Sequence, residues 1–259
     1  MTLLAATPFE NFGTSHLAML GVFVLGIWPV VALGRRVRGT QDEMRVSRIY
    51  AALIPCFTIP LQVIDFLPGN YDLQTTLPLQ LCDFAWIVAV AALWTHRRTP
   101  VALTYFWGLA LTTQALITPA LVNDLPDPKF IAYWAMHLLI VWAAIFLTWG
   151  LGLHPTWRDY RRTVAITAGW AAAVFCFNVA VGTNYGFLNR KPETSILDLL
   201  GPWPLYVVVE IALVSAVWAL MTWPWERSRH CARECRGITL GVRRLDPVTH
   251  PDNPWEPAP

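Results

Sequence analysis

Long apolar runs alternate with short polar segments along most of the chain. A helical bilayer crossing needs about 20 predominantly apolar residues, and seven runs have this length. Proline and glycine inside some runs are compatible with spanning helices, because neighbouring helices satisfy the freed backbone groups. The pattern therefore predicts an all-α, polytopic membrane protein with seven transmembrane helices, near His16–Gly34, Val46–Leu67, Leu77–Trp94, Pro100–Leu121, Phe130–Gly150, Thr163–Asn184 and Trp203–Trp223.

Basic residues between the runs indicate an orientation. Sixteen arginines lie in the first, third and fifth connections and after the last run, whereas the other side has only Lys129, Arg190 and Lys191. Because basic loops remain on the cytoplasmic side, we expect the N-terminus outside and the C-terminus in the cytoplasm. The sequence predicts a multi-pass cell-membrane protein with a transmembrane domain at residues 1–225 and a basic, proline-rich, disordered tail at 226–259.

Composition supports the membrane assignment. The chain of 259 residues is 55% hydrophobic and 14% charged, with a mean hydropathy of +0.43, whereas soluble domains contain about 25% charged residues. The basic residues are scattered between apolar runs, so we expect membrane lipids and no nucleic acid as partners. The five cysteines have neither disulfide nor zinc-site spacing, and we predict no metal and no cofactor.

Polar residues within the predicted helices concentrate in their outer halves. The segment LPLQLCDFAW places Gln80, Cys82 and Asp83 in the first two turns of the third run, and His137 lies two turns into the fifth. We predict a polar cavity between the outer halves of the helices, because ionisable groups in a membrane mark functional sites by default. Its other candidate residues are Gln114, Asn178, Asn184, Tyr185 and Glu210.

Three interpretations of these residues stay open on the sequence alone. Cys82 and His137 could form a nucleophile–base pair, in which a carboxylate orients the imidazole. The same polar residues could bind a small molecule or an ion. Asn and Gln side chains also commonly form interhelical hydrogen bonds with a purely structural role.

Four segments carry a family resemblance. LPLQLCDFAW, TYFWGLALTTQALITP, VGTNYGFLNRKP and SILDLLGPWPLY together resemble the YwaF-like family of bacterial integral membrane proteins. That family is similar to a eukaryotic transmembrane acyltransferase implicated in ether-phospholipid remodelling, and more distantly to androgen-induced-gene-type lipid esterases, which use threonine in place of cysteine. The resemblance implies that Cys82 and His137 carry acyl transfer.

The leading hypothesis is a lipid acyltransferase or esterase acting in the outer leaflet, with a lipid or acyl substrate. Asp83 or Asn178 would orient His137, and Arg190 and Lys191 would contact a lipid phosphate. The alternative is a small-molecule or proton-coupled transporter in which Asp83, His137 and Glu210 are the contacts. A retinal photoreceptor is excluded, because the seventh run contains no lysine for a Schiff base.

Overall fold

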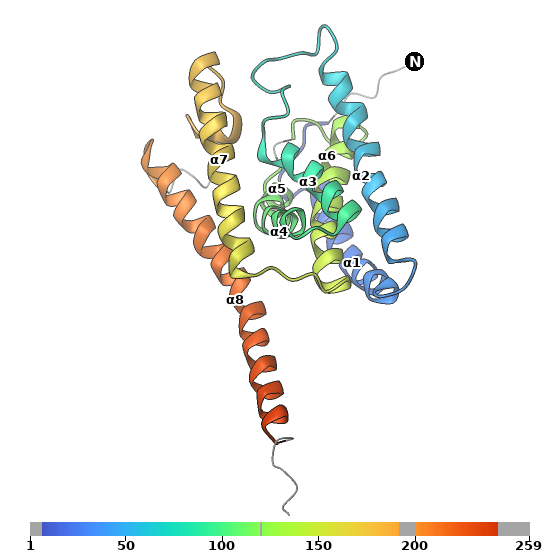
Figure 1. The fold of residues 1–259 in the computed structure, drawn as a ribbon. Coiled ribbons are helices and arrows are strands. Elements are labelled where there is room, and N and C mark those ends of the chain that lie inside the picture. Colours follow the sequence, from blue (N-terminus) through green and yellow to red (C-terminus); the bar gives the residue numbers. More distant parts are fainter. Residues whose placement is uncertain (1–6, 120, 192–199, 243–259) are drawn as a thin grey trace, which may run out of the picture.

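The computed structural model describes residues 7–119, 121–191 and 200–242, the segment 229–242 by its backbone alone. These residues are largely helical, and the β-structure among them is one isolated bridge between Pro8 and Asn123. Figure 1 shows the elements in chain order: α1 (Thr14–Val37), α2 (Glu43–Asp65), α3 (Leu81–Thr95), α4 (Arg98–Phe106), η1 (Trp107–Thr112), α5 (Thr113–Ile117), α6 (Pro128–Ile145), η2 (Phe146–Gly150), α7 (Trp157–Val181), η3 (Tyr185–Phe187) and α8 (Leu205–Val242).

Six helical segments of the described chain are long and apolar enough to cross a membrane. The prediction of an all-α, multi-pass membrane protein is therefore confirmed. The third predicted span is shorter than expected, since α3 begins at Leu81 and has 15 residues. Pro78 lies in the non-helical segment before it, which the sequence placed inside the helix. The six segments are Thr14–Val37, Glu43–Asp65, Arg98–Ile117, Pro128–Gly150, Trp157–Val181 and Leu205–Ser228.

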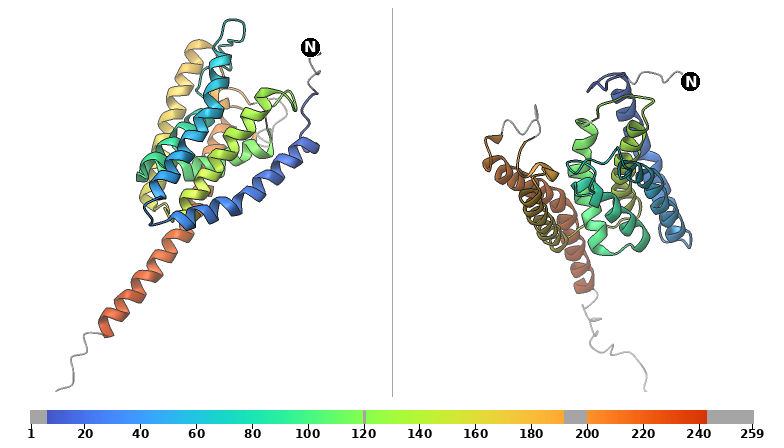
Figure 2. Two further views of the ribbon diagram at one scale, coloured as in Figure 1. Left: turned by 90° about the vertical axis from the view of Figure 1, so that its right-hand side faces the viewer. Right: turned by 90° about the horizontal axis from the view of Figure 1, so that it is seen from above.

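The helices form a body and a flanking pair. Figures 1 and 2 show α1 to α6 grouped together, with α7 and α8 side by side next to them. α7 packs against α4 and α8. The second half of α8 extends beyond the body as a single helix (Figure 2). The predicted tail thus begins inside α8, whose backbone is helical to Val242, and residues 243–259 lie outside the described part of the chain.

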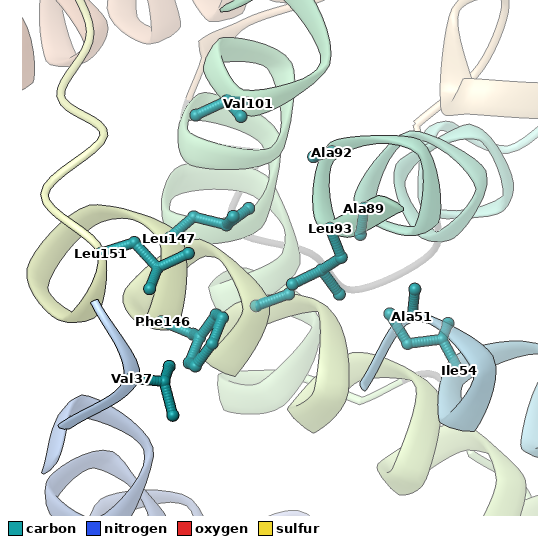
Figure 3. Close-up of a cluster of buried hydrophobic side chains, with 11 residues drawn as sticks. Val37, Ala51, Ile54, Ala89, Ala92, Leu93, Val101, Phe146, Leu147 and Leu151 are labelled. Carbon is teal, nitrogen blue, oxygen red and sulfur yellow. The ribbon is translucent and has the colours of Figure 1, made fainter. Parts of the chain in front are cut away.

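The main apolar core joins helices far apart in the sequence. Figure 3 shows Val37 of α1, Ile54 of α2, Leu93 of α3 and Phe146 of η2 packed in one cluster. Ala89 and Ala92 face the same cluster and are fully buried, so small side chains let α3 approach its neighbours closely. α3 is thus a central element despite its short length.

Two glycines allow α1 to touch η2. A Cβ atom built on Gly34 would lie 2.6 Å from the Gly150 Cα atom, closer than real Cβ contacts allow. Within membranes, helix association depends on this kind of close packing because there is no hydrophobic driving force between helices. The contact fixes the end of α1 against the end of α6–η2.

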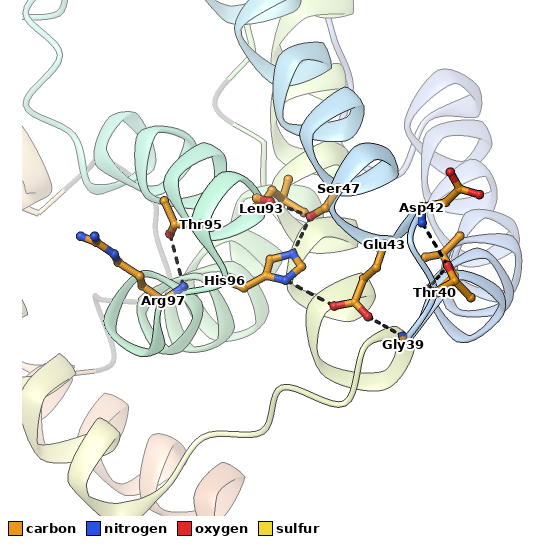
Figure 4. Close-up of polar contacts among 10 residues, drawn as sticks. Gly39, Thr40, Asp42, Glu43, Ser47, Leu93, Thr95, His96 and Arg97 are labelled. Atoms are coloured by element: carbon orange, nitrogen blue, oxygen red, sulfur yellow. Dashed lines mark hydrogen bonds and ion pairs between the residues drawn. The ribbon is translucent and has the colours of Figure 1, made fainter.

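Polar contacts close the arginine-rich end of the bundle. Figure 4 shows His96, just after α3, with Nε2 2.8 Å from Ser47 Oγ and Nδ1 3.5 Å from Glu43 Oε1, both on α2. Ser47 is fully buried and donates to the Leu93 carbonyl, so this trio joins helices and presents no accessible nucleophile. Nearby, Arg98 pairs with Asp159 at 2.8 Å. The first, third and fifth connections therefore meet at one end.

We predict that Gly34→Ala destabilises the protein. The added methyl group would overlap the Gly150 backbone, and overpacking of this kind costs about 1–3 kcal/mol. The measurement is the thermal unfolding midpoint of the purified protein in detergent. Gly21→Ala is the matched control on α1, because no atom lies within 4 Å of its Cβ position. Equal midpoints for the two variants would contradict the close approach as the cause.

We also predict that acid weakens the arginine-rich end through His96. Burial lowers the pKa of His96, Glu43 opposes this change and Arg48 adds to it. The folded state therefore holds its proton less tightly than the unfolded chain, so the free energy of unfolding falls as the pH drops through about 6.5. In His96→Gln the unfolding midpoint should depend less on pH below this value. An unchanged pH dependence would exclude His96 as its source.

Candidate functional site

Cys82 lies in the first turn of α3, at the end of the bundle opposite the arginines. It is a free cysteine of intermediate exposure. Backbone N–H groups at a helix N-terminus favour negative charge, which suits a thiolate. Cys82 is thus a partly exposed thiol beside the Asp83 carboxylate, and its activation as a nucleophile stays a prediction.

The Asp83 carboxylate has a local structural partner. Its Oδ2 accepts the backbone N–H of Gln80 at 3.0 Å, the bond that a carboxylate makes in a capping box. Asp83 and His137 share no hydrogen bond in the structure. The Asp83 carboxylate therefore stabilises the start of α3. Its role in orienting His137 stays a prediction.

The segment GTNYGF after α7 holds the start of α3 in place. Gln80 Oε1 accepts the Gly186 N–H at 2.9 Å. The Tyr185 hydroxyl donates to the Leu73 carbonyl at 2.7 Å and accepts the Leu77 N–H at 3.0 Å. Tyr185 is fully buried. Through these bonds the loop before α3 and the loop after α7 form one unit.

Asn178 organises that unit from the last turn of α7. Its Oδ1 accepts the Tyr185 N–H at 2.9 Å and the Thr183 hydroxyl at 2.8 Å, and its Nδ2 donates to the Tyr185 carbonyl at 2.8 Å. The side chain is 1% exposed, so all its polar atoms are satisfied by protein. Asn178 therefore influences the position of Cys82 indirectly, through Tyr185 and the segment before α3.

Gly186 and Trp170 were not identified from the sequence as part of this unit. Gly186 has a φ of +67°, and a Cβ atom there would lie 2.7 Å from the Trp170 ring. The Trp170 Nε1 donates to the Leu79 carbonyl at 3.3 Å. The only sequence signal was the glycine itself, inside the motif that also carries Tyr185.

Asn184 shapes the next turn of the chain. Its Oδ1 accepts the N–H groups of Asn189 and Arg190, and its Nδ2 donates to the Arg190 carbonyl at 2.9 Å. This fixes the backbone of Arg190, whose side chain is exposed, and Lys191 follows it directly. Both cations lie at the Cys82 end, where the sequence placed them.

His137 is buried in α6 with a defined tautomer. Its Nδ1 lies 2.7 Å from the Tyr133 carbonyl, which can only accept, so Nδ1 carries the hydrogen. The Tyr133 ring packs on the imidazole with centroids 4.1 Å apart. Nε2 then has a lone pair, and among the described residues it has no hydrogen-bond partner. This is the form that a general base requires.

Cys82 and His137 lie on adjacent helices, because α3 packs against α6. Ala85 of α3 and Ile140 of α6 belong to one buried cluster, in which Leu81 and Met136 also pack. Cys82 and His137 each precede their cluster residue by three positions, about 4.5 Å along the helix. The structure contains no hydrogen bond between the two side chains, so their pairing stays a prediction.

The remaining candidates lie apart. Gln114 is exposed at the end of the α4–η1–α5 segment, and Glu210 is half-buried on α8, one turn after the fully buried Tyr206. Asp65, at the end of α2, is a further carboxylate within the spans and forms an ion pair with Lys129 at 2.9 Å. None of the described His, Cys, Asp and Glu side chains gathers in a group of three or more that would hold a metal ion.

Comparison with known proteins adds one match. A model of the TMEM164 family matches residues 11–222, which include every helix from α1 to α7 and most of the span in α8. Neither a curated protein nor a solved structure matches the chain.

We predict that Asn178→Ala loosens the start of α3. The substitution leaves the buried N–H and carbonyl of Tyr185 without partners, and each unsatisfied group costs about 1–3 kcal/mol. Cys82 should then react faster with a maleimide, measured in a background where the other four cysteines, Cys56, Cys176, Cys231 and Cys235, are replaced by alanine. Gln114→Ala is the control, because its side chain is exposed and has no hydrogen-bond partner among the described residues. Identical Cys82 reactivity in both variants would contradict this role of Asn178.

Proposed function

The chain belongs to the TMEM164 family of membrane proteins, and from this premise we propose that it is a lipid acyltransferase or esterase of the cell membrane. Cys82 is the proposed nucleophile and His137 the proposed general base. The observation that carries the proposal is the tautomer of His137, whose Nδ1 bond to the Tyr133 carbonyl leaves a lone pair on Nε2, on a helix that packs against α3. The likeness of four segments to the YwaF-like family supports the same chemistry.

The proposal includes a seventh crossing by α3. Its 15 residues span about 22 Å, less than the apolar thickness of about 30 Å. Its two ends nevertheless contact opposite ends of the bundle: Gln80 bonds to Gly186, and His96 lies against Ser47. With seven crossings the arginine-rich end is cytoplasmic, and Cys82 lies in the outer half of the membrane.

Acyl transfer would proceed in two steps. His137 Nε2 removes the thiol proton of Cys82, and the sulfur attacks the acyl carbonyl of a lipid ester. The carbon–sulfur bond forms, the ester carbon–oxygen bond breaks, and the proton passes from His137 to the leaving alcohol. In the second step His137 deprotonates a lysolipid hydroxyl or water, which attacks the thioester and releases the Cys82 thiol.

The cations beside this site favour a phospholipid substrate. Arg190 is exposed and its backbone is fixed by Asn184, and Lys191 follows it. We propose that these two residues contact the lipid phosphate, while the acyl chains remain between the helices. Guanidinium and ammonium groups are the usual protein partners of phosphate.

The transporter alternative has less support from the contacts. Asp83 is used in the helix start and Asp65 in an ion pair, which leaves Glu210 as the carboxylate within the spans that has no hydrogen bond or ion pair among the described residues. Uptake of a substrate into proteoliposomes that Glu210→Gln abolishes and Cys82→Ser preserves would favour transport over catalysis.

We predict a thioester on Cys82. The protein in nanodiscs is incubated with a phospholipid that carries an alkyne-tagged acyl chain, and the label is tested for release by hydroxylamine. Cys82→Ala should remove the label and His137→Gln should slow its formation by about 100-fold or more. Cys56→Ala, an exposed cysteine of α2, should keep it. Equal labelling of the two alanine variants would end the cysteine mechanism.

A further inference from the structure

A cavity of about 230 Å³ lies at the arginine-rich end, away from Cys82. It is lined by His96, Arg98, Gly152, His154 and Asp159, with Val101 and Ala102 among its apolar lining residues. Trp225 of α8 stacks on the His154 ring, with centroids 4.0 Å apart. The cavity thus lies between the α3–α4 connection and the η2–α7 connection, beside the starts of α4 and α7. The proposed acyl chemistry uses none of its lining residues.

Arg98 offers hydrogen-bond donors to this cavity. Its Nη2 donates to Asp159 Oδ2 at 2.8 Å and to Thr156 Oγ1 at 3.3 Å. Its Nε and Nη1 groups have no acceptor among the described residues, and the side chain is 65% exposed. A guanidinium with a fixed orientation and free N–H groups is suited to an oxyanion.

Arg38 supplies a second guanidinium at the edge of the cavity. A Cβ atom built on Gly152 would lie 2.6 Å from Arg38 Cζ, so the guanidinium lies directly over this lining glycine. Gly152 has a φ of +78°, a conformation that suits glycine. Arg38 is exposed, and its side chain forms no hydrogen bond or ion pair with the described residues. Two arginines from different connections therefore lie beside one cavity.

Asp159 adds an unsatisfied acceptor. Its Oδ2 accepts from Arg98 and from the N–H and hydroxyl of Thr156, which starts α7 with a capping box. Its Oδ1 is buried and has no donor in the described part of the chain. A buried acceptor without a donor is rare and needs an explanation. A ligand that carries both negative oxygens and a hydrogen-bond donor would satisfy Asp159 and the two arginines together.

We propose that this cavity binds a phosphate monoester or inorganic phosphate in its singly protonated form. The oxygens accept from Arg98 and Arg38, and the P–OH group donates to Asp159 Oδ1. The second proton of such a phosphate has a pKa of about 6, so the protonated form is present near neutral pH. Sulfate has the same shape and no proton to donate, so the carboxylate discriminates against it.

The ligand has two possible sources. A soluble phosphate monoester would enter from the aqueous side, and a lipid whose headgroup is a phosphate monoester would enter from the adjacent leaflet. A phosphodiester headgroup has no P–OH group and fits less well. The inference is independent of the acyl chemistry, because its site lies beside the opposite end of α3.

The test is binding to the purified full-length protein by isothermal titration calorimetry. We expect inorganic phosphate and glycerol 3-phosphate to bind, and sulfate to bind at least about tenfold more weakly, since one hydrogen bond to a charged group is lost. Arg38→Gln should weaken phosphate binding by about tenfold or more. Arg97→Gln, an exposed neighbour that does not line the cavity, should leave it unchanged.

Arg38→Gln is preferred to a substitution of Arg98, because the Arg38 side chain makes no hydrogen bond among the described residues, whereas Arg98 holds Asp159 and its loss could unfold the protein. If phosphatidic acid in nanodiscs binds more tightly than glycerol 3-phosphate, the natural ligand is a lipid; if glycerol 3-phosphate binds more tightly, it is a soluble phosphate monoester. Either result supports the phosphate chemistry. Absence of phosphate binding, equal binding of sulfate, or equal losses in Arg38→Gln and Arg97→Gln would overturn it.

Discussion

The absence of water inside a bilayer requires buried polar groups to find partners within the protein, and the Asn178 side chain meets that requirement for a whole loop. Its three hydrogen bonds to Thr183 and Tyr185 fold the chain back after α7. Tyr185 then holds the segment before α3. The position of Cys82 is a consequence of these bonds, because α3 begins where this loop fixes it.

The two ends of α3 are held in different ways. At its start the contacts are neutral hydrogen bonds to backbone groups, as in Gln80 with Gly186. At its end they involve ionisable groups, with His96 beside Glu43 and Arg98 paired with Asp159 nearby. A short helix is thereby fixed at both ends. The proposed acyl site and the proposed phosphate site lie beside these two ends.

Much of the fold could be predicted from the apolar pattern, because spanning helices need long apolar runs whatever their neighbours. Five of the predicted spans differ from the observed helices only near their ends. Two helices differ more. α3 begins only at Leu81, after Pro78, and Asp83 caps its start. α8 continues beyond the predicted span to Val242. Asp83 was predicted as a site residue because carboxylates in apolar runs usually are, and the structure adds its bond to the Gln80 N–H, which was not predicted from the sequence.

By itself, the sequence determined that the chain is an all-α, multi-pass membrane protein, since apolar length and composition depend on no tertiary contact. It also placed Cys82 and His137 in comparable positions along their helices. Only the tertiary structure showed the hydrogen bonds of the polar residues: Asn178 bonds to Thr183 and Tyr185, and Tyr185 bonds to the segment before α3, whereas Asp83 caps its own helix. It alone brought Arg38, Arg98 and Asp159 to one cavity, because they come from three connections that pattern and spacing cannot relate.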